Sequence, residues 1–145
     1  MRPIVEIIAE NPSAEIHDTI DTALTAFNAE MRGFAPETPD FAVVLRDPQT
    51  STVIGGLYGT DDYGWSYIKF LLVPKSYRGI GLGAELLTEA ETIARKRGSI
   101  GVWLGTFAFQ ARAFYEKQGY DRWCVMEGYP PGHSQIWYRK ALVPA

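Results

Sequence analysis

Apolar residues recur every three or four positions in two stretches of the chain, which indicates two amphipathic helices. The first stretch covers residues 14–31, and Ser13 stands where its N-cap would lie. Its apolar positions are Ile16, Ile20, Leu24 and Phe27. The second stretch covers residues 82–98 and ends in basic residues followed by Gly98, a typical C-terminal signal. Its apolar positions are Leu82, Leu86, Ala90, Ile93 and Ala94.

Between these helices the apolar period changes to two, which is typical of strands. Residues 41–47 (FAVVLRD), 51–60 (STVIGGLYGT) and 65–73 (WSYIKFLLV) are separated by the turn sequences DPQT and DDYG. The pattern predicts a three-stranded antiparallel meander. The other predicted elements are strands at 3–8, 100–107, 120–127 and 134–142 and a short helix at 109–119.

Taken in chain order, these elements give β-α-β-β-β-α-β-α-β-β. The order predicts an α/β fold with a mixed, mostly antiparallel sheet of seven strands flanked by helices. A length of 145 residues predicts one domain, residues 1–145, that buries its own core. No internal repeat or low-complexity linker divides the chain.

Composition and charge narrow the classes of function. Cys124 is the one cysteine, so an internal disulfide framework and a multi-cysteine zinc site are excluded, and a reducing cytoplasm is expected. The first residues match neither a signal peptide nor a membrane span, so no membrane partner is expected. A net charge of −3 argues against general nucleic-acid binding. Eight acidic and two basic residues in the first forty favour a cationic substrate or, equally, a solvated helix face.

Three glycines at alternate positions separate the third strand of the meander from the second helix. Strand, glycine loop and helix together present backbone N–H groups to an anion, and Arg78 precedes the glycines. The loop lacks the Gly-Lys-Ser/Thr of a Walker A motif, and it follows an antiparallel meander rather than the first strand of a Rossmann unit. A plain strand-to-helix turn is the competing interpretation. The glycines are Gly79, Gly81 and Gly83.

Two motifs in order resemble those of the GCN5-related N-acetyltransferase (GNAT) family. The loop RGIGLGAELL resembles the family's pyrophosphate loop, and ARAFYEKQGY, further along the chain, resembles its later A-x-x-F-Y-x-x-x-G-F/Y motif. FLLV resembles the end of the family's fourth strand, and the order of elements matches over nearly the whole chain. The resemblance implies a single acetyl-CoA-binding N-acetyltransferase domain, with acetyl-CoA as co-substrate and no metal.

The resemblance also implies roles for individual residues. Tyr115 would be the general acid that protonates the leaving thiolate; packing within its short helix is the competing interpretation. Gln110 would replace a cofactor-contacting asparagine that the family often has two positions earlier, where this chain has Ala108. The pantetheine would be held by the main chain of Leu71, Leu72 and Val73. The pyrophosphate would be held by Arg78, Gly79, Ile80, Gly81, Leu82 and Gly83.

No sequence motif identifies the residues that would deprotonate the acceptor amine or determine the specificity for it. A base is needed because an amine arrives as ammonium, and Glu30 at the end of the first helix is one candidate. The other candidates are Asp61, Asp62, Glu127 and His133, of which the two aspartates fit simple turn chemistry. The loops at 31–40 and 127–135 would border the acceptor, although the second could simply shield a sheet edge. Cys124 is expected to be a buried apolar residue.

The implied function is transfer of an acetyl group from acetyl-CoA to a primary amine, by direct attack in a ternary complex. A small molecule is the expected acceptor, and a protein lysine or N-terminus is the alternative. The family often forms dimers, so a homodimer is a further expectation. A non-catalytic acyl-CoA-binding or sensing module of the same fold is the alternative from another class. A nucleotide enzyme is disfavoured because the loop has neither a lysine nor a magnesium-binding hydroxyl.

Overall fold

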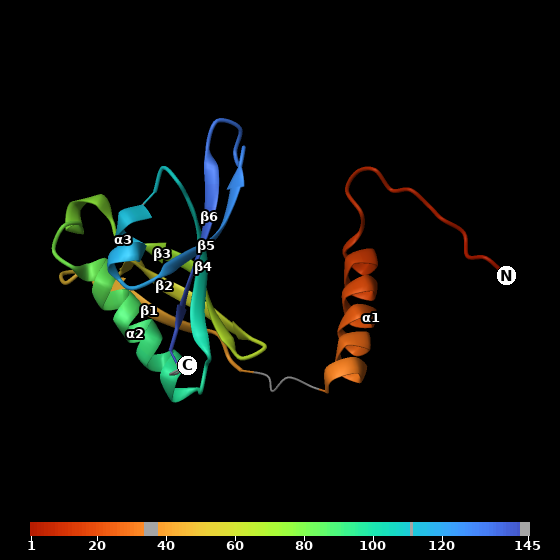
Figure 1. Cartoon of the computed structure of the whole chain (residues 1–145), viewed down its shortest axis with the longest axis horizontal. Coiled ribbons are helices and arrows are strands. Elements are labelled where there is room, and N and C mark those ends of the chain that lie inside the picture. Colours follow the sequence, from red (N-terminus) through yellow and green to blue (C-terminus); the bar gives the residue numbers. More distant parts are fainter. Residues whose placement is uncertain (34–37, 111, 143–145) are drawn as a thin grey trace. The chain divides into compact units, whose positions relative to one another are not determined.

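The computed structural model describes residues 1–33, 38–110 and 112–142, and the chain forms two compact units, Met1–Pro36 and Glu37–Ala145. The relative position of the two units is not determined (Figure 1). The expectation of one domain therefore stays a prediction. Of the loop at 31–40, residues 34–37 lie outside the described residues.

The first unit contains helix α1 (Ala14–Arg32), which confirms the helix predicted from the apolar period. Ser13 caps it, because the Ser13 side chain accepts a hydrogen bond from the backbone N–H of Ile16 at 3.3 Å. The strand predicted at residues 3–8 is wrong, because residues 1–9 have no regular secondary structure. A strand is stabilised by pairing, and this short apolar run pairs with no strand of the described residues.

The second unit is built on one sheet of six strands, so the fold class is confirmed and the predicted count of seven is one too many. The strands are β1 (Phe41–Arg46), β2 (Val53–Asp62), β3 (Trp65–Leu72), β4 (Gly101–Phe107), β5 (Asp121–Glu127) and β6 (Ser134–Ala141). Their spatial order is β1-β2-β3-β4-β6-β5 (Figure 1). Only the β3–β4 pair is parallel among these strands, so the sheet is mostly antiparallel as expected.

Helices α2 (Leu82–Lys96) and α3 (Arg112–Lys117) lie on the same face of the sheet, and a short 3-10 turn, η1 (Lys75–Tyr77), precedes α2 (Figure 1). The core lies between α2 and the sheet. Its fully buried side chains include Leu87, Ala90, Val102, Leu104 and Tyr138. The apolar stripe predicted for residues 82–98 therefore faces the sheet, as its period indicated.

A buried polar cluster fixes α2 to the last strand. Glu91 is 5% exposed and accepts hydrogen bonds from the Tyr120 hydroxyl at 3.2 Å and from Lys140 Nζ at 2.7 Å. The Glu91 carboxylate and the Tyr120 hydroxyl both find partners, so the cluster satisfies the buried charge that it contains. The cluster thereby fixes the C-terminal half of α2 on the sheet, and the glycine loop adjoins the other end of this helix.

The sheet opens at its centre, between the two parallel strands. β3 and β4 pair over three residues each, Trp65–Tyr67 with Gly101–Trp103, and then separate. The separation coincides with a bulge in β3, where the register against β2 skips Lys69. A bulge bends its strand and increases its local twist, so β3 leaves β4 at this point. The ends of both strands therefore border an opening in the sheet.

Candidate functional site

A cavity of about 610 Å³ lies where β3 and β4 separate. The end of β3, the glycine loop, the start of α2, the end of β4 and α3 together enclose it. The described residues that line it are Leu71, Leu72, Val73, Tyr77, Arg78, Gly79, Gly81, Leu82, Gly83, Ala84, Thr106, Gln110, Phe114, Tyr115 and Gln118. A cavity of this size lies within the range usual for small-molecule and cofactor sites.

The three glycines of the loop are required for two different reasons. Gly79 and Gly81 have backbone φ angles of +83° and +88°, the left-handed region that side chains rarely adopt, and a β-carbon there would point into open space. Gly83 instead allows close packing, because a β-carbon on it would lie 3.0 Å from the Phe114 ring. The first two glycines therefore set the path of the loop, and the third lets α3 approach α2.

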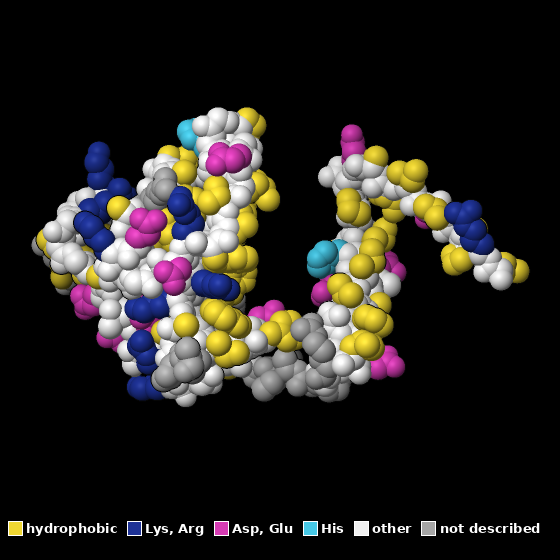
Figure 2. All heavy atoms as spheres, in the orientation of Figure 1, with side chains coloured by type: hydrophobic (Ala, Val, Ile, Leu, Met, Phe, Trp, Pro, Cys, Tyr) yellow, Lys and Arg dark blue, Asp and Glu magenta, His cyan; other side chains and the backbone are white. Residues whose placement is uncertain are grey.

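The loop presents positive charge and free backbone donors to the cavity. Gly81 is the N-cap of α2 and has no side chain to bond the first N–H groups of the helix. Residues 73–84 include Lys75 and Arg78 and no acidic residue. Figure 2 shows Lys and Arg side chains over this loop and around α3, and further ones along the lower part of α2. A helix N-terminus with such neighbours is a favourable site for an anion.

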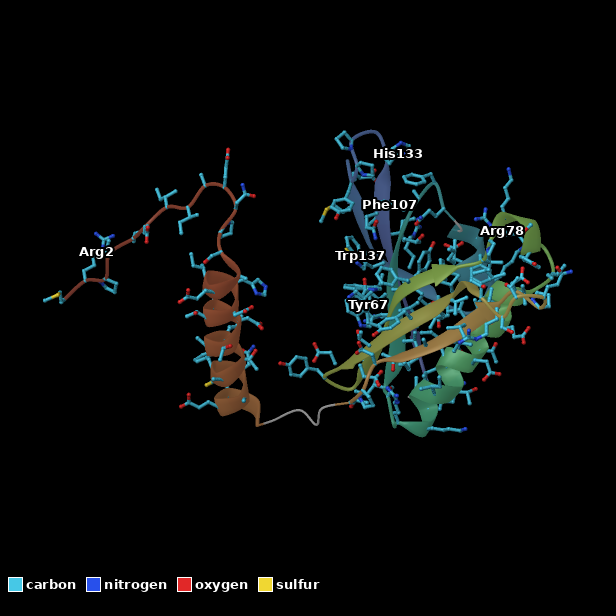
Figure 3. All side chains as sticks on the ribbon, turned by 180° about the vertical axis from the view of Figure 1, so that it is seen from behind. Arg2, Tyr67, Arg78, Phe107, His133 and Trp137 are labelled. Atoms are coloured by element: carbon cyan, nitrogen blue, oxygen red, sulfur yellow. The ribbon has the colours of Figure 1, made fainter. Side chains whose placement is uncertain are left out.

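Arg78 also fixes the end of β3. Its Nε donates a hydrogen bond to the carbonyl oxygen of Val73 at 2.9 Å, and its terminal nitrogens have no partner among the described residues. The guanidinium thus closes the turn through one nitrogen and keeps the others available for a second, anionic partner. Figure 3 shows where Arg78 lies on the ribbon.

Tyr115 lies on α3 with its ring in an aromatic cluster. The ring is 7% exposed, and its centroid lies 5.1 Å from Phe114, 6.2 Å from Tyr120 and 5.7 Å from Tyr138. Its hydroxyl has no hydrogen-bond partner among the described residues, and the residue lines the cavity. Burial raises the pKa of Tyr115 to about 12, so the phenol keeps its proton at neutral pH.

The raised pKa of Tyr115 predicts a loss of stability at alkaline pH. The folded chain holds the phenol proton more tightly than the unfolded chain, so this contribution is present below pH 10.0 and is lost as the pH rises toward about 12. Between neutral pH and roughly pH 11, the free energy of unfolding of the wild type should therefore fall by about 1 kcal/mol through the ionisation of Tyr115. Tyr115→Phe lacks the ionisable group and should not show this part of the fall. Urea unfolding at several alkaline pH values checks this, and parallel pH profiles would contradict it.

Gln110 joins the cavity to the end of β4. Its Oε1 accepts hydrogen bonds from the Thr106 hydroxyl at 2.9 Å and from the Phe107 backbone N–H at 3.0 Å. Its Nε2 has no partner among the described residues and is left to donate to a ligand in the cavity. The side chain is thus held in one orientation by its oxygen.

The structure brings together all but two of the residues predicted for the site. The Ile80 side chain is 71% exposed, and the residue does not line the cavity. Only the backbone of Ile80 could therefore take part in the predicted pyrophosphate loop. Glu30 lies in the first unit, and its role as a base stays a prediction. The lining residues that sequence reasoning missed are Tyr77, Ala84, Thr106, Phe114 and Gln118. Ala84, Phe114 and Gln118 lie within the predicted motifs and Tyr77 adjoins one, whereas nothing local marks Thr106.

The other base candidates have defined surroundings. Asp61 forms an ion pair with Arg97 at 2.6 Å and also accepts from the Ser66 hydroxyl, so it has a structural role at the end of α2. Glu127 accepts a hydrogen bond from Ser134 at 2.7 Å. Cys124 is exposed on β5, which contradicts the expected burial, because β5 is an edge strand with every residue exposed.

Two general features of the chain can be checked in the described residues. No group of three His, Cys, Asp or Glu side chains within residues 1–33, 38–110 and 112–142 is arranged to hold a metal ion. In the same residues, no helix combines the length and apolar character needed to cross a bilayer.

Comparison with known proteins agrees with this geometry. The sequence profile of the acetyltransferase (GNAT) family matches residues 4–120. The chain is 32% identical over 134 residues to an acetyltransferase of Agrobacterium fabrum (Atu2258), covering 92% of this chain and 96% of the relative. It is 40% identical over 79 residues to the blasticidin-S acetyltransferase of Streptomyces morookaense, covering 54% of this chain and 58% of the relative.

Solved structures agree in fold. An Agrobacterium tumefaciens structure described as an acetyltransferase superposes with a TM-score of 0.86 at 30% identity, covering 96% of this chain and 100% of that chain. A Bacillus anthracis structure described as a streptothricin acetyltransferase in complex with acetyl coenzyme A has a TM-score of 0.61 at 22% identity, covering 75% and 65%. The chain therefore belongs to the acetyltransferase (GNAT) family and is an acetyl-CoA-dependent acyltransferase.

Proposed function

We propose that this enzyme transfers the acetyl group of acetyl-CoA to a primary amine of a small molecule, by direct attack in a ternary complex. The observation that carries the proposal is the single cavity that joins an anion-binding loop to the buried Tyr115 across the opening between β3 and β4. A cofactor bound along it would have its phosphates at one end and its thioester at the other.

The glycine loop and the end of β3 would bind different parts of the cofactor. The pyrophosphate would lie against the N-terminus of α2 and the free nitrogens of Arg78. The pantetheine would follow the main chain of Leu71, Leu72 and Val73, whose strand no longer pairs with β4. Gln110 Nε2 would donate to the arm from the opposite side.

The reaction then needs three events at the thioester. The neutral amine nitrogen attacks the acetyl carbonyl carbon and forms a C–N bond, and the negative charge moves to the carbonyl oxygen. The tetrahedral intermediate collapses, its C–S bond breaks, and coenzyme A leaves as a thiolate that takes up a proton. A backbone N–H near Val73 would stabilise the charge on the oxygen. The amine proton is released to a base or to water.

Tyr115 would act on the leaving sulfur mainly by donating a hydrogen bond. The Tyr115 pKa is about 12 in the free protein. An ordinary thiol has a pKa of about 8.5, so full transfer from this phenol would be uphill by roughly 5 kcal/mol. A hydrogen bond to the developing thiolate stabilises the transition state without that cost. Where the phenol passes its proton to the sulfur as a general acid, the resulting phenolate would take up a proton from water.

The acceptor is proposed to be a small molecule because of the relatives and the charge. The relative from Streptomyces morookaense is named for the acetylation of blasticidin-S. The cationic amine expected from the eight acidic side chains of the first forty residues stays a prediction. Glu30, Glu127, His133 or a water path would serve as the base. A homodimer and a cytoplasmic location stay predictions.

Arg78→Gln should weaken the binding of acetyl-CoA about tenfold or more, because a charge-assisted contact to phosphate contributes on the order of 1.5–3 kcal/mol. S-acetylpantetheine lacks the pyrophosphate, so its KM should change much less. Measuring kcat/KM for both donors in both proteins checks this. An equal loss for the two donors would place the effect in the Val73 turn, which Arg78 also holds.

A turnover screen distinguishes the proposal from its alternatives. Release of free thiol from acetyl-CoA is measured with polyamines, aminoglycosides, amino acids and lysine peptides as acceptors. Turnover with a small amine supports the proposal, and turnover with lysine peptides alone would make the acceptor a protein. Tight binding of coenzyme A without turnover of any amine would instead identify a non-catalytic acyl-CoA-binding module. Titration with ATP serves as the control for a nucleotide site.

A further inference from the structure

Four aromatic rings form an exposed cluster around the end of β4 and the β5–β6 loop. Phe107 stacks on Phe109 with ring centroids 5.1 Å apart and on Tyr129 at 6.0 Å, and Phe109 meets the edge of His133 at 4.9 Å. Phe109 is 59% exposed and Tyr129 is 49% exposed. Burial in the core therefore does not explain the rings of Phe109 and Tyr129, whose exposed parts are available to a planar partner.

The cluster lies next to the cofactor cavity but on the opposite face of β4. Thr106 lines the cavity, and side chains alternate along a strand, so Phe107 points to the other face. The Phe107 backbone N–H is bonded to Gln110, which lines the cavity. In Figure 3, Phe107, Trp137 and Tyr67 lie along one side of the sheet, with His133 beyond them. A molecule on the cluster would thus reach the thioester through the opening between β3 and β4.

Gln135 adds an unpaired polar group to this surface. It pairs in register with Phe107, so the two side chains share a face of the sheet. Gln135 is 9% exposed, and its Oε1 is buried with no hydrogen-bond partner among the described residues. Its Nε2 likewise has no partner in that part of the chain. The buried Oε1 is an acceptor, so a ligand or a water with a donor would complete it, whereas the Nε2 group is a donor that can meet an acceptor of a ligand.

Gly105 is the residue that lets Gln135 take this position. A β-carbon at residue 105 would lie 2.6 Å from Gln135 Nε2 and 3.0 Å from the indole nitrogen of Trp137. The amide Nε2 of Gln135 and the indole N–H of Trp137 therefore both lie over Gly105, on the face of the sheet that carries Phe107. Both donors offer hydrogen bonds to the edge of a molecule whose face stacks on the aromatic cluster.

We infer that this surface is the acceptor site and that it selects primary amines carrying a planar ring with a hydrogen-bond acceptor on its edge. The inference rests on the proposed acetyl transfer. The rings of Phe107, Phe109 and Tyr129 hold the face of the substrate, and Gln135 holds its edge. Residues 127–135 carry one acidic residue, Glu127, and no Lys or Arg, so the surface does not repel a cationic amine.

Three matched amines test the inference: 2-phenylethylamine, 2-cyclohexylethylamine and 2-(pyridin-2-yl)ethylamine. Removing the π face while keeping the shape of the ring should lower kcat/KM about tenfold, a difference that ring stacking of this kind can supply. Adding the ring nitrogen should raise it a further several-fold through Gln135. Thiol release from acetyl-CoA gives each value.

Three variants assign the two preferences to residues. Phe109→Leu should bring the phenyl and cyclohexyl amines to similar kcat/KM, and Gln135→Leu should remove only the advantage of the pyridyl amine. Gly105→Ala, whose β-carbon displaces the flexible end of Gln135, should reproduce the Gln135 effect. Trp123→Leu is the control, because Trp123 is 50% exposed on β5 and makes no ring contact with the cluster among the described residues. The KM for acetyl-CoA should be unchanged in all four.

The outcomes separate this inference from the proposed function. Turnover of polyamines or lysine peptides with no preference among the three ring amines would overturn the inference and leave acetyl transfer standing. If no amine is turned over, the inference is tested by calorimetric titration of the coenzyme A complex with 2-(pyridin-2-yl)ethylamine. Binding that Gln135→Leu weakens about fivefold or more supports the surface as a ligand site, and undetectable binding overturns it.

Discussion

Gly81→Val should weaken the binding of acetyl-CoA at least about 100-fold, equivalent to roughly 2.7 kcal/mol. Gly81 has a φ of +88°, and a β-branched residue is strongly disfavoured in that region. Valine would therefore move the loop out of the conformation that begins α2, and its side chain would enter the space left for the phosphates. Calorimetric titration with acetyl-CoA or coenzyme A measures the effect.

Gly98→Val is the matched control for this substitution. Gly98 follows the other end of the same helix, has a φ of +75° and likewise has open space where its β-carbon would point. Both variants should lose about 1–2 kcal/mol of stability from the left-handed conformation, but only Gly81→Val should lose the cofactor. Similar acetyl-CoA affinities in the two variants would mean that the phosphates bind elsewhere.

Tyr115→Phe should lower kcat at least about tenfold at neutral pH while leaving the affinity for acetyl-CoA nearly unchanged. The substitution keeps the ring and its contacts with Phe114 and Tyr138, and it removes only the hydroxyl that would meet the leaving sulfur. Because the raised pKa keeps the phenol protonated, the effect should be the same across the neutral pH range. Pre-steady-state thiol release measures the chemical step directly.

Tyr120→Phe provides the comparison for Tyr115→Phe. Tyr120 lies 6.2 Å away in the same aromatic cluster, does not line the cavity, and donates its hydroxyl to Glu91. This variant should lose stability with little change in kcat, because Glu91 keeps Lys140 but loses one buried hydrogen bond. A comparable fall in kcat for both variants would assign the effect to packing and would remove Tyr115 as the donor.

The sequence predicts the residues of the proposed cofactor site because its signals are local. Alternating glycines after an arginine indicate a tight turn or a close approach of the backbone, and the structure has positive φ at both Gly79 and Gly81. Helices at 14–31 and 82–98 follow from the apolar period and from caps within a few residues. The meander follows from period-two runs and turn residues. In each case the information lies within one short stretch of chain.

The missing parts depend on contacts between distant stretches. An alternating apolar run at residues 3–8 has strand character but pairs with no described strand, so period alone misassigned it. Cys124 is exposed because β5 lies at the edge of the sheet, which its own sequence does not reveal. Gln135 comes beside Gly105 and Phe107 only through the β4–β6 register. The proposed acceptor surface therefore cannot be predicted until the pairing of the strands is known.

The early separation of β3 from β4 affects how strongly the stability and abundance of the protein depend on its cofactor. Beyond Tyr67 and Trp103, each strand keeps its outer neighbour but turns an unpaired inner edge toward the other. Unpaired edges invite association between chains, and a pantetheine bonded along β3 would occupy one of them. A cofactor at 100 times its Kd would stabilise the fold by about 2.7 kcal/mol. The abundance of this enzyme should therefore rise and fall with the cell's supply of coenzyme A.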